Sequence, residues 1–314
     1  MRARVLLLVP LLAFAGVFAG TLAYYELGND EAPAAATTQA AARTQGTLIV
    51  ALEQKPGVRL YVVSADGSGG RFVTGDNEPT DGSVLVEAHP DWSPTTERIV
   101  FTRYTVKGQD AAPPKIWSVA PDGSDLVQLT HGDDPDFLAA WSPDGERIAF
   151  TRELDGSAEI FVMNADGSEV TQLTRDSAVN DEHPAWSPDG THIAYTSGSE
   201  EHQDLYVMSA DGSSPTRITG GPFFAADPAW SPQGDRIVFV CDADLCLVRP
   251  ELGARPAKLV GTRPKESSPR WSADGGSIAF ARFPGGVFLV DVETERTTRV
   301  PLDGETFTLS WGPA

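Results

Sequence analysis

The chain has 314 residues, of which 44 are acidic and 24 are basic, and its formal net charge is −20. A chain this acidic repels phosphate backbones, and it has no cluster of Lys and Arg with interleaved aromatic residues, so we do not expect a nucleic acid partner. The sequence also lacks a G-x-S-x-G elbow, an H-E-x-x-H motif and a Gly-rich phosphate loop. It therefore shows none of the local signatures of the common hydrolases and nucleotide-binding enzymes.

The N-terminal segment, residues 1–25, is a candidate for membrane insertion. Arg2 and Arg4 precede an almost uncharged apolar run from Val5 to Tyr25. This run is long enough to span a bilayer at about 1.5 Å per residue, yet the small residues before Gly20 also suit a cleavage site. We predict either a signal peptide or an N-terminal membrane anchor and leave both open. The basic start places the remainder of the chain outside the cytoplasmic membrane, anchored to the cell envelope or secreted.

Residues 26–46 are rich in Ala, Thr and Pro and have no strand pattern, so we predict a flexible linker.

The rest of the chain carries two repeated sequence motifs. The first is a tryptophan followed by Ser-Pro or a remnant of it, and it recurs every 40 to 49 residues, at Trp92, Trp141, Trp186, Trp230, Trp271 and Trp311. The second is an Asp-Gly turn after an apolar run, which begins at Ser64, Ala120, Asn164 and Ser209. Two motifs in a fixed order define one structural unit.

The unit is clearest between residues 184 and 219. Short apolar runs alternate there with turn residues, and the predicted strands are Pro184–Trp186, His192–Thr196, Asp204–Met208 and Thr216–Thr219. Pro-Asp-Gly and Asp-Gly sequences supply the tight turns between them. One four-stranded meander cannot bury both of its faces alone, so copies must pack on one another. A period of about 40 to 45 residues with four strands per unit is typical of propeller blades.

The pattern P-x-W-S-P-D-G-x-x-I-A-[FY]-T, followed by an apolar strand and A-D-G-S, resembles the WD40-like (PD40) repeat of TolB-like six-bladed β-propellers. The resemblance covers residues 47–314 and implies an all-β propeller. Three strands, Thr47–Leu52, Arg59–Ser64 and Arg71–Thr74, have no Trp-Ser-Pro strand before them, whereas Thr306–Trp311 is a lone first strand. We therefore expect the C-terminal strand to pair with the N-terminal blade and close a ring of six blades.

The two cysteines, Cys241 and Cys246, bracket a short hairpin turn, and an exported protein meets oxidants. A disulfide is the expectation, and metal binding by the two thiols is the alternative.

Loops opposite the repeated turns differ from blade to blade, so we place the binding site on that face, around the central channel. Candidate residues there include the positions just before the first-strand proline or its equivalent, together with two nearby carboxylates. They are His89, Asp136, Glu182, His183 and Asp227. Of these, His89, His183 and Asp227 are also weak candidates for a divalent metal site. The adjacent Phe223 and Phe224 either anchor a partner or fold onto their blade.

These observations favour an extracytoplasmic, non-enzymatic and monomeric protein that holds a protein or peptide partner at the channel and needs no cofactor. It would contact the membrane only through its N-terminal segment. The alternative is a metal-assisted carbohydrate lyase or hydrolase, because the resemblance extends to propellers that cleave acidic sugars at the channel mouth. A third possibility is a purely structural spacer without a ligand.

Overall fold

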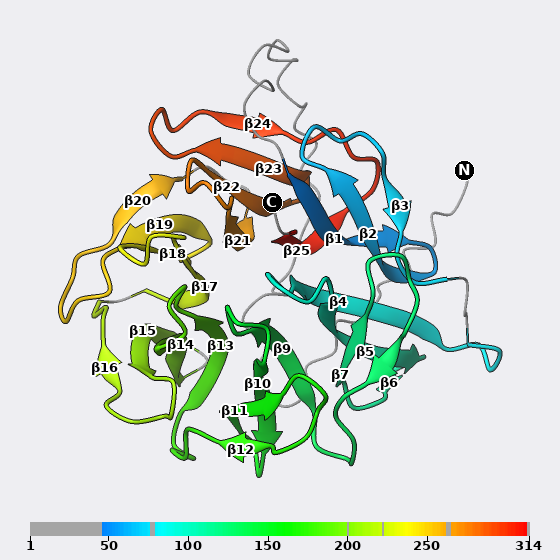
Figure 1. Cartoon of the computed structure of the whole chain (residues 1–314), viewed down its shortest axis with the longest axis horizontal. Coiled ribbons are helices and arrows are strands. Elements are labelled where there is room, and N and C mark those ends of the chain that lie inside the picture. The colour runs from blue at the N-terminus through cyan, green and yellow to red at the C-terminus, as the bar shows by residue number, and fades with distance from the viewer. Residues whose placement is uncertain (1–45, 76–78, 200, 222, 262–264, 313–314) are drawn as a thin grey trace, which may run out of the picture.

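The structure is a computed structural model, and it describes residues 46–75, 79–199, 201–221, 223–261 and 265–312. Every regular element in these ranges is a β-strand, arranged as a propeller around a central axis (Figure 1). Within the same ranges, no helix is long and apolar enough to cross a membrane. The predicted signal peptide or anchor, residues 1–25, and all but the last residue of the predicted linker lie outside the described residues.

Four sheets are separate antiparallel blades of four strands each. The first contains β9 (Asp136–Trp141), β10 (Arg147–Leu154), β11 (Ser157–Asn164) and β12 (Thr171–Gln172). The second contains β13 (Asn180–Trp186), β14 (His192–Ser199), β15 (His202–Ser209) and β16 (Thr216–Arg217). The third contains β17 (Ala225–Trp230), β18 (Ile237–Cys241), β19 (Asp244–Val248) and β20 (Ala257–Val260). The fourth contains β21 (Lys265–Trp271), β22 (Ser277–Phe283), β23 (Gly286–Asp291) and β24 (Thr297–Arg299).

The remaining nine strands form one continuous sheet. They are β1 (Thr47–Gln54), β2 (Gly57–Ser64), β3 (Arg71–Phe72), β4 (Val84–Trp92), β5 (Ile99–Lys107), β6 (Asp110–Ala111), β7 (Lys115–Val119), β8 (Val127–Gln128) and β25 (Thr306–Trp311). The C-terminal strand β25 pairs antiparallel with β1, so Leu309 lies opposite Val50. The sheet continues from β2 to β4 through a single parallel pair, Val58 opposite Val86. Both ends of the described chain therefore meet within one sheet.

Both fourth strands with predicted bounds, Arg71–Thr74 and Thr216–Thr219, are shorter in the structure, and for the second a threonine explains why. The predicted strand Thr216–Thr219 ends at Arg217, and the Thr219 hydroxyl accepts a hydrogen bond from the Leu205 amide at 2.9 Å. Thr130 and Thr174 do the same for the amides of Ile116 and Ile160. Because the threonine hydroxyl accepts the hydrogen bond of this third-strand amide, the fourth strand need not continue its backbone pairing with the third strand.

The hydrophobic core lies between adjacent blades, because each sheet presents alternate residues to its two neighbours. Between the first two separate blades, Ala149 and Ile160 pack against Trp186, Ile193 and Tyr195. The aromatic position of the repeat's I-A-[FY]-T segment supplies the largest fully buried side chains, Phe101, Phe150, Phe239 and Phe280. The repeated sequence pattern therefore becomes a repeated interface.

Three of the six repeated tryptophans join neighbouring blades through the indole N–H. Trp230 donates to the Ala185 carbonyl at 3.1 Å, Trp271 to the Ala229 carbonyl at 3.1 Å, and Trp311 to the Arg270 carbonyl at 2.9 Å. Each acceptor belongs to the innermost strand of the preceding blade. These tryptophans are therefore links between blades as well as core residues.

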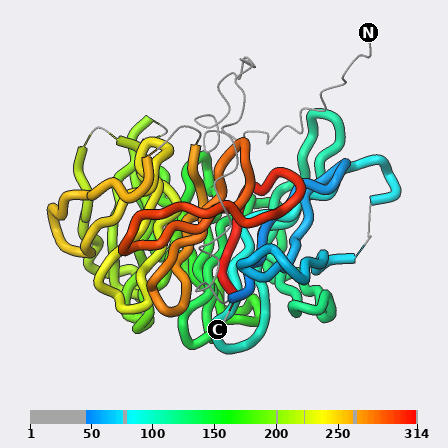
Figure 2. The backbone as a smooth tube through the Cα atoms, turned by 90° about the horizontal axis from the view of Figure 1, so that it is seen from above, coloured from blue at the N-terminus to red at the C-terminus, as the bar shows by residue number. Residues whose placement is uncertain are grey.

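Both kinds of repeated turn lie at the same end of the blades. The Ala165 amide donates to the Glu146 carbonyl at 2.9 Å, and the Ala210 amide donates to the Thr191 carbonyl at 2.9 Å, so each pair of turns is in contact. The innermost strands run toward this end, where β25 also ends (Figure 2). We call it the turn face, and we call the opposite end the loop face.

Candidate functional site: a polar pocket in the central channel

The channel wall is shaped by a bulge in each innermost strand. In β4, β9, β13, β17 and β21, one residue has a positive φ between 49° and 56°, and the pairing register with the second strand shifts at that point. These residues are His89, Leu138, His183, Asp227 and Ser268. A bulge changes the direction of a side chain that would otherwise point to one of the two sheet faces in regular alternation. Each of these residues lies three positions before a repeated tryptophan, as does Thr308 in β25.

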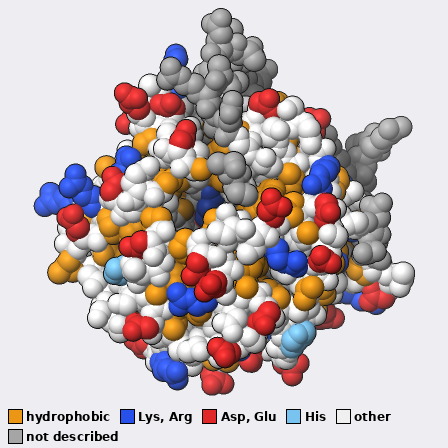
Figure 3. Space-filling model, in the orientation of Figure 1, with side chains coloured by type: hydrophobic (Ala, Val, Ile, Leu, Met, Phe, Trp, Pro, Cys, Tyr) orange, Lys and Arg blue, Asp and Glu red, His pale blue; other side chains and the backbone are white. Residues whose placement is uncertain are grey.

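These six side chains line one pocket on the channel axis. Its wall also includes Pro184, Pro228 and Arg270, so every innermost strand contributes to it. Seen from the turn face, a hollow opens near the middle of the ring, and side chains coloured as Lys or Arg are visible in it (Figure 3). The predicted residues His89, His183 and Asp227, which come from three different blades, are therefore brought together here.

His183 and Asp227 are in direct contact across a blade boundary, with His183 Nε2 3.3 Å from Asp227 Oδ1. The other oxygen, Oδ2, accepts the Ser268 amide at 3.0 Å. Burial alone would raise the pKa of Asp227, but His183, Arg270 and the Ser268 amide together bring that pKa below its ordinary value. The carboxylate is therefore ionised at neutral pH and held by partners on two other blades.

His89 lines the same pocket. Its amide donates to the Thr308 hydroxyl at 2.8 Å, which ties β4 to β25. Burial lowers the pKa of His89 to about 4, with Asp227 opposing the shift and the charges of His183 and Arg270 reinforcing it. The imidazole is therefore neutral at pH 7, where it can both donate and accept a hydrogen bond.

Arg270 and Asp91 are polar residues of the channel that the sequence analysis did not select. Asp91 Oδ2 accepts the Trp141 amide at 2.8 Å, and its Oδ1 accepts the Ser310 hydroxyl at 3.1 Å. Arg270 lines the pocket and donates through Nη1 to the Pro269 carbonyl at 2.9 Å. Both residues immediately precede a repeated tryptophan. Aligning the chain on its tryptophans would have identified them.

Asp136 and Glu182, which we had expected at the channel mouth, do not line the pocket. Asp136 is fully buried and pairs with Arg152, whose Nε lies 2.6 Å from its Oδ1. The two residues are register partners in β9 and β10, two positions before the bulge at Leu138, so the carboxylate points between blades. Burial raises the pKa of Glu182, and its carboxylate accepts the Gln203 side chain at 2.9 Å.

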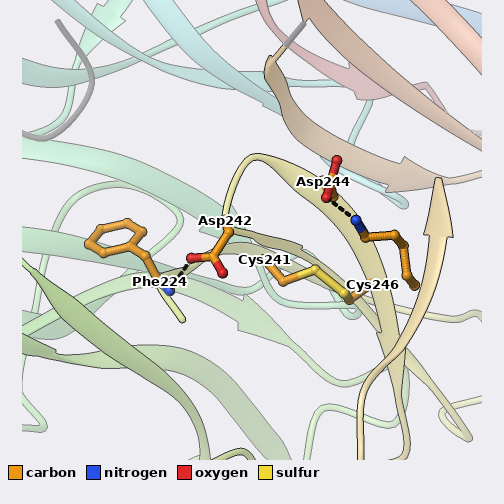
Figure 4. The surroundings of a disulfide bond; sticks show 6 residues. Phe224, Cys241, Asp242, Asp244 and Cys246 are labelled. Atoms are coloured by element: carbon orange, nitrogen blue, oxygen red, sulfur yellow. Dashed lines mark hydrogen bonds and ion pairs between the residues drawn. A yellow bond between two sulfur atoms is a disulfide. The ribbon is translucent and has the colours of Figure 1, made fainter. Parts of the chain in front are cut away.

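The two phenylalanines of the β16–β17 loop also lie away from the pocket lining. Phe223 packs on Phe239 with ring centroids 6.2 Å apart, which corresponds to folding onto the blade. The Phe224 amide donates to Asp242 Oδ1 at 2.9 Å, and its carbonyl accepts the Asp242 amide at 3.1 Å (Figure 4). The two hydrogen bonds between Phe224 and Asp242 therefore hold the loop against the β18–β19 hairpin.

Cys241 and Cys246 form a disulfide with a Cα–Cα distance of 5.9 Å (Figure 4). Cys241 lies opposite Ala225, at the register position where Arg152 lies opposite Asp136 and Arg282 opposite Glu266 in other blades. The third separate blade thus carries a covalent link where these two blades carry a buried ion pair. With both sulfurs bonded to each other, neither thiolate is free to bind a metal.

Within the described residues, no three His, Cys, Asp or Glu side chains are grouped so that they could hold a metal ion. His89, His183 and Asp227 share the pocket, but they are not arranged as a set of metal ligands.

Comparison with known proteins matches residues 53–314 to the TolB β-propeller domain family. The chain belongs to this family. It is 29% identical over 189 residues to a TolB homolog of Chlorobium luteolum, covering 58% of this chain and 33% of that protein. It is 30% identical over 135 residues to the Tol-Pal system protein TolB of Anaeromyxobacter dehalogenans, covering 40% of this chain and 30% of the relative. The chain thus spans about a third of the length of these relatives.

Among solved structures, TolB from Acinetobacter baumannii superposes with a TM-score of 0.71 at 22% identity, covering 86% of this chain and 67% of that one. At this identity the likeness shows the propeller fold. Within that fold, the pocket of this TolB β-propeller offers a neutral imidazole, an ionised carboxylate, two hydroxyls and a guanidinium from four innermost strands. This mixed set of donors and acceptors suits recognition of a polar group that enters the channel.

Proposed function

We propose that this TolB β-propeller is a non-enzymatic binding protein that holds a protein or peptide partner at its central channel. The observation that carries the proposal is the pocket, because every innermost strand contributes a side chain to it. A rigid ring with such a pocket presents a preformed site for an inserted loop or chain end. A relative named as a protein of the Tol-Pal system is in keeping with a protein partner.

We also infer that the ring has six blades. The nine-stranded sheet divides at the single parallel pair between β2 and β4 into β25-β1-β2-β3 and β4-β5-β7-β8, with β6 beside β5. Each half has a repeated tryptophan at the end of its innermost strand, like the four separate blades. Counting the halves separately gives six blades, closed by pairing of β25 with β1.

We further propose that residues 1–25 export the chain, as a signal peptide or as an anchor, and that residues 26–46 tether the ring of residues 47–314 in the cell envelope. The basic residues before the apolar run support this orientation. In this arrangement the ring acts as a monomer outside the cytoplasmic membrane. The disulfide between Cys241 and Cys246 fits an oxidising compartment.

Affinity capture from solubilised envelope tests the proposed function. The full-length chain is the bait, and a His183→Ala, Asp227→Ala variant lacks the contact between two blades in the pocket. A matched variant, His192→Ala with Glu169→Ala, changes exposed residues outside the pocket. We expect one protein to be retained by the wild type and the matched variant and lost by the pocket variant. Equal retention by all three baits, with equal melting temperatures, would refute a channel site.

A further inference from the structure

Arg270 has most of its hydrogen-bonding capacity unused. A guanidinium has five N–H donors, and the Arg270 side chain uses one of them, toward the Pro269 carbonyl. In the described part of the chain, this guanidinium forms no direct ion pair with a carboxylate. Arg270 nevertheless lines the pocket. Asp91 and Asp227 compensate the charge of Arg270 through space, but a guanidinium pairs most strongly with a carboxylate that accepts its N–H groups directly.

The carboxylates nearest to Arg270 are already engaged by fixed donors. Asp91 accepts the Trp141 amide and the Ser310 hydroxyl, and Asp227 accepts the Ser268 amide and contacts His183. Both carboxylates attract the positive charge of the guanidinium, yet neither forms a direct ion pair with its N–H groups. Within the described residues, Nε and Nη2 of Arg270 make no hydrogen bond, and an edge of this kind matches a carboxylate in two parallel hydrogen bonds.

The pocket also offers hydroxyl groups to a ligand. Two hydroxyl residues, Ser268 and Thr308, line the same pocket. The Thr308 oxygen accepts the His89 amide, so its hydrogen is free to donate. A carboxylate at Arg270 would therefore find hydroxyl donors in the same pocket.

We propose that Arg270 binds a carboxylate of a peptide that enters the channel, either an acidic side chain or the C-terminal group. This inference rests on the proposed function and specifies the chemistry that the pocket recognises. With a net charge of −20, the chain repels anions at long range, so such recognition depends on the direct pair with the guanidinium. A neutral peptide of the same shape would lack that pair.

Ligand-observed NMR with the full-length protein tests the proposal. The probes are acetyl-Ala-Asp-Ala-amide, acetyl-Ala-Ala-Ala with a free C-terminal carboxylate, and the neutral acetyl-Ala-Asn-Ala-amide, each titrated at millimolar concentration. We expect at least one carboxylate peptide to bind and the neutral peptide to bind at least about tenfold more weakly. The probe that binds identifies whether the side chain or the chain end is recognised. Absence of binding by both carboxylate peptides, or equal binding of all three, would overturn the proposal.

The variants are Arg270→Gln, Arg270→Lys and, as a matched control on the surface, Arg296→Gln. We expect about a tenfold loss of affinity for the Gln variant, a smaller loss for Lys, which keeps the charge without the fork, and no change for the control. If Arg270→Gln does not fold, Arg270→Lys decides, and affinity equal to the wild type would overturn the assignment. Should Arg270→Gln lose no affinity for peptides while partner capture still depends on His183 and Asp227, the Arg270 proposal alone fails.

Discussion

The pairing of the chain ends gives a sharp test of how the ring is held together. Leu309 of β25 is 1% exposed and packs in one cluster with Val50 of β1, its register partner. Replacing such a leucine with alanine removes buried methyl groups and leaves a cavity, at a cost of about 2–5 kcal/mol in the free energy of unfolding. For a domain of this size, about 3 kcal/mol corresponds to a fall of roughly 6–12 °C in melting temperature.

A double-mutant cycle shows whether this loss arises from contact between the two ends. Leu309→Ala, Val50→Ala and the double variant are unfolded in urea, and the free energies are compared. Residues in contact are coupled by about 0.5–3 kcal/mol, so the double variant should lose less than the sum of the single losses. Leu252→Ala is the control, because Leu252 is 79% exposed and its replacement should cost less than about 0.5 kcal/mol. Additive losses, or a Leu309→Ala variant as stable as the control, would refute closure through β25 and β1.

Three further changes have defined outcomes. Replacing Cys241 and Cys246 with serine should lower the free energy of unfolding by about 2 kcal/mol or less, because the bridge closes a short loop, and chemical denaturation under non-reducing conditions checks this. Burial raises the pKa of Asp181 from 3.8 to about 6, so the unfolded chain ionises first and the native state loses stability as the pH rises from about 4 to 6. Asp181→Asn should therefore melt above the wild type at pH 7 and converge with it near pH 4; the opposite trend in melting curves would show that the carboxylate stabilises the fold. Trp230→Phe loses a hydrogen bond to the preceding blade and should cost about 1 kcal/mol more than Trp186→Phe, since within the described residues the Trp186 indole N–H has no partner. Equal losses in denaturant titrations would argue against this link between blades.

The sequence was sufficient to predict the blades because their signals are local. A Pro-Asp-Gly turn fixes backbone geometry within four residues, and alternating apolar runs identify strands without knowledge of their neighbours. The expectation that His183 and Asp227 lie at the channel followed from their position just before the first-strand proline. The bulge that directs these side chains into one pocket could not be predicted in the same way. A bulge exists only when two strands are paired and one of them has an extra residue.

The same limit explains the expectations for Asp136 and Phe223. Asp136 looked like a channel carboxylate, but its partner Arg152 is a register neighbour on the next strand, and pairing turns both between blades. Phe223 could have been exposed or folded down, and its contact with Phe239 depends on where the loop crosses the blade. Arg270 carries no motif of its own. Its place beside His183 and Asp227 becomes visible only once the innermost strands surround a channel.

Site-specific photocrosslinking tests the central claim most directly. A photoreactive amino acid is placed in the full-length chain either at Leu138, which lines the pocket, or at Leu252, which is exposed and is not among the pocket residues. After irradiation of intact cells, we expect a crosslinked protein from position 138 and none from position 252. Crosslinking of the same protein from position 252, with none from 138, would place the partner on the outside of the ring and contradict binding at the channel.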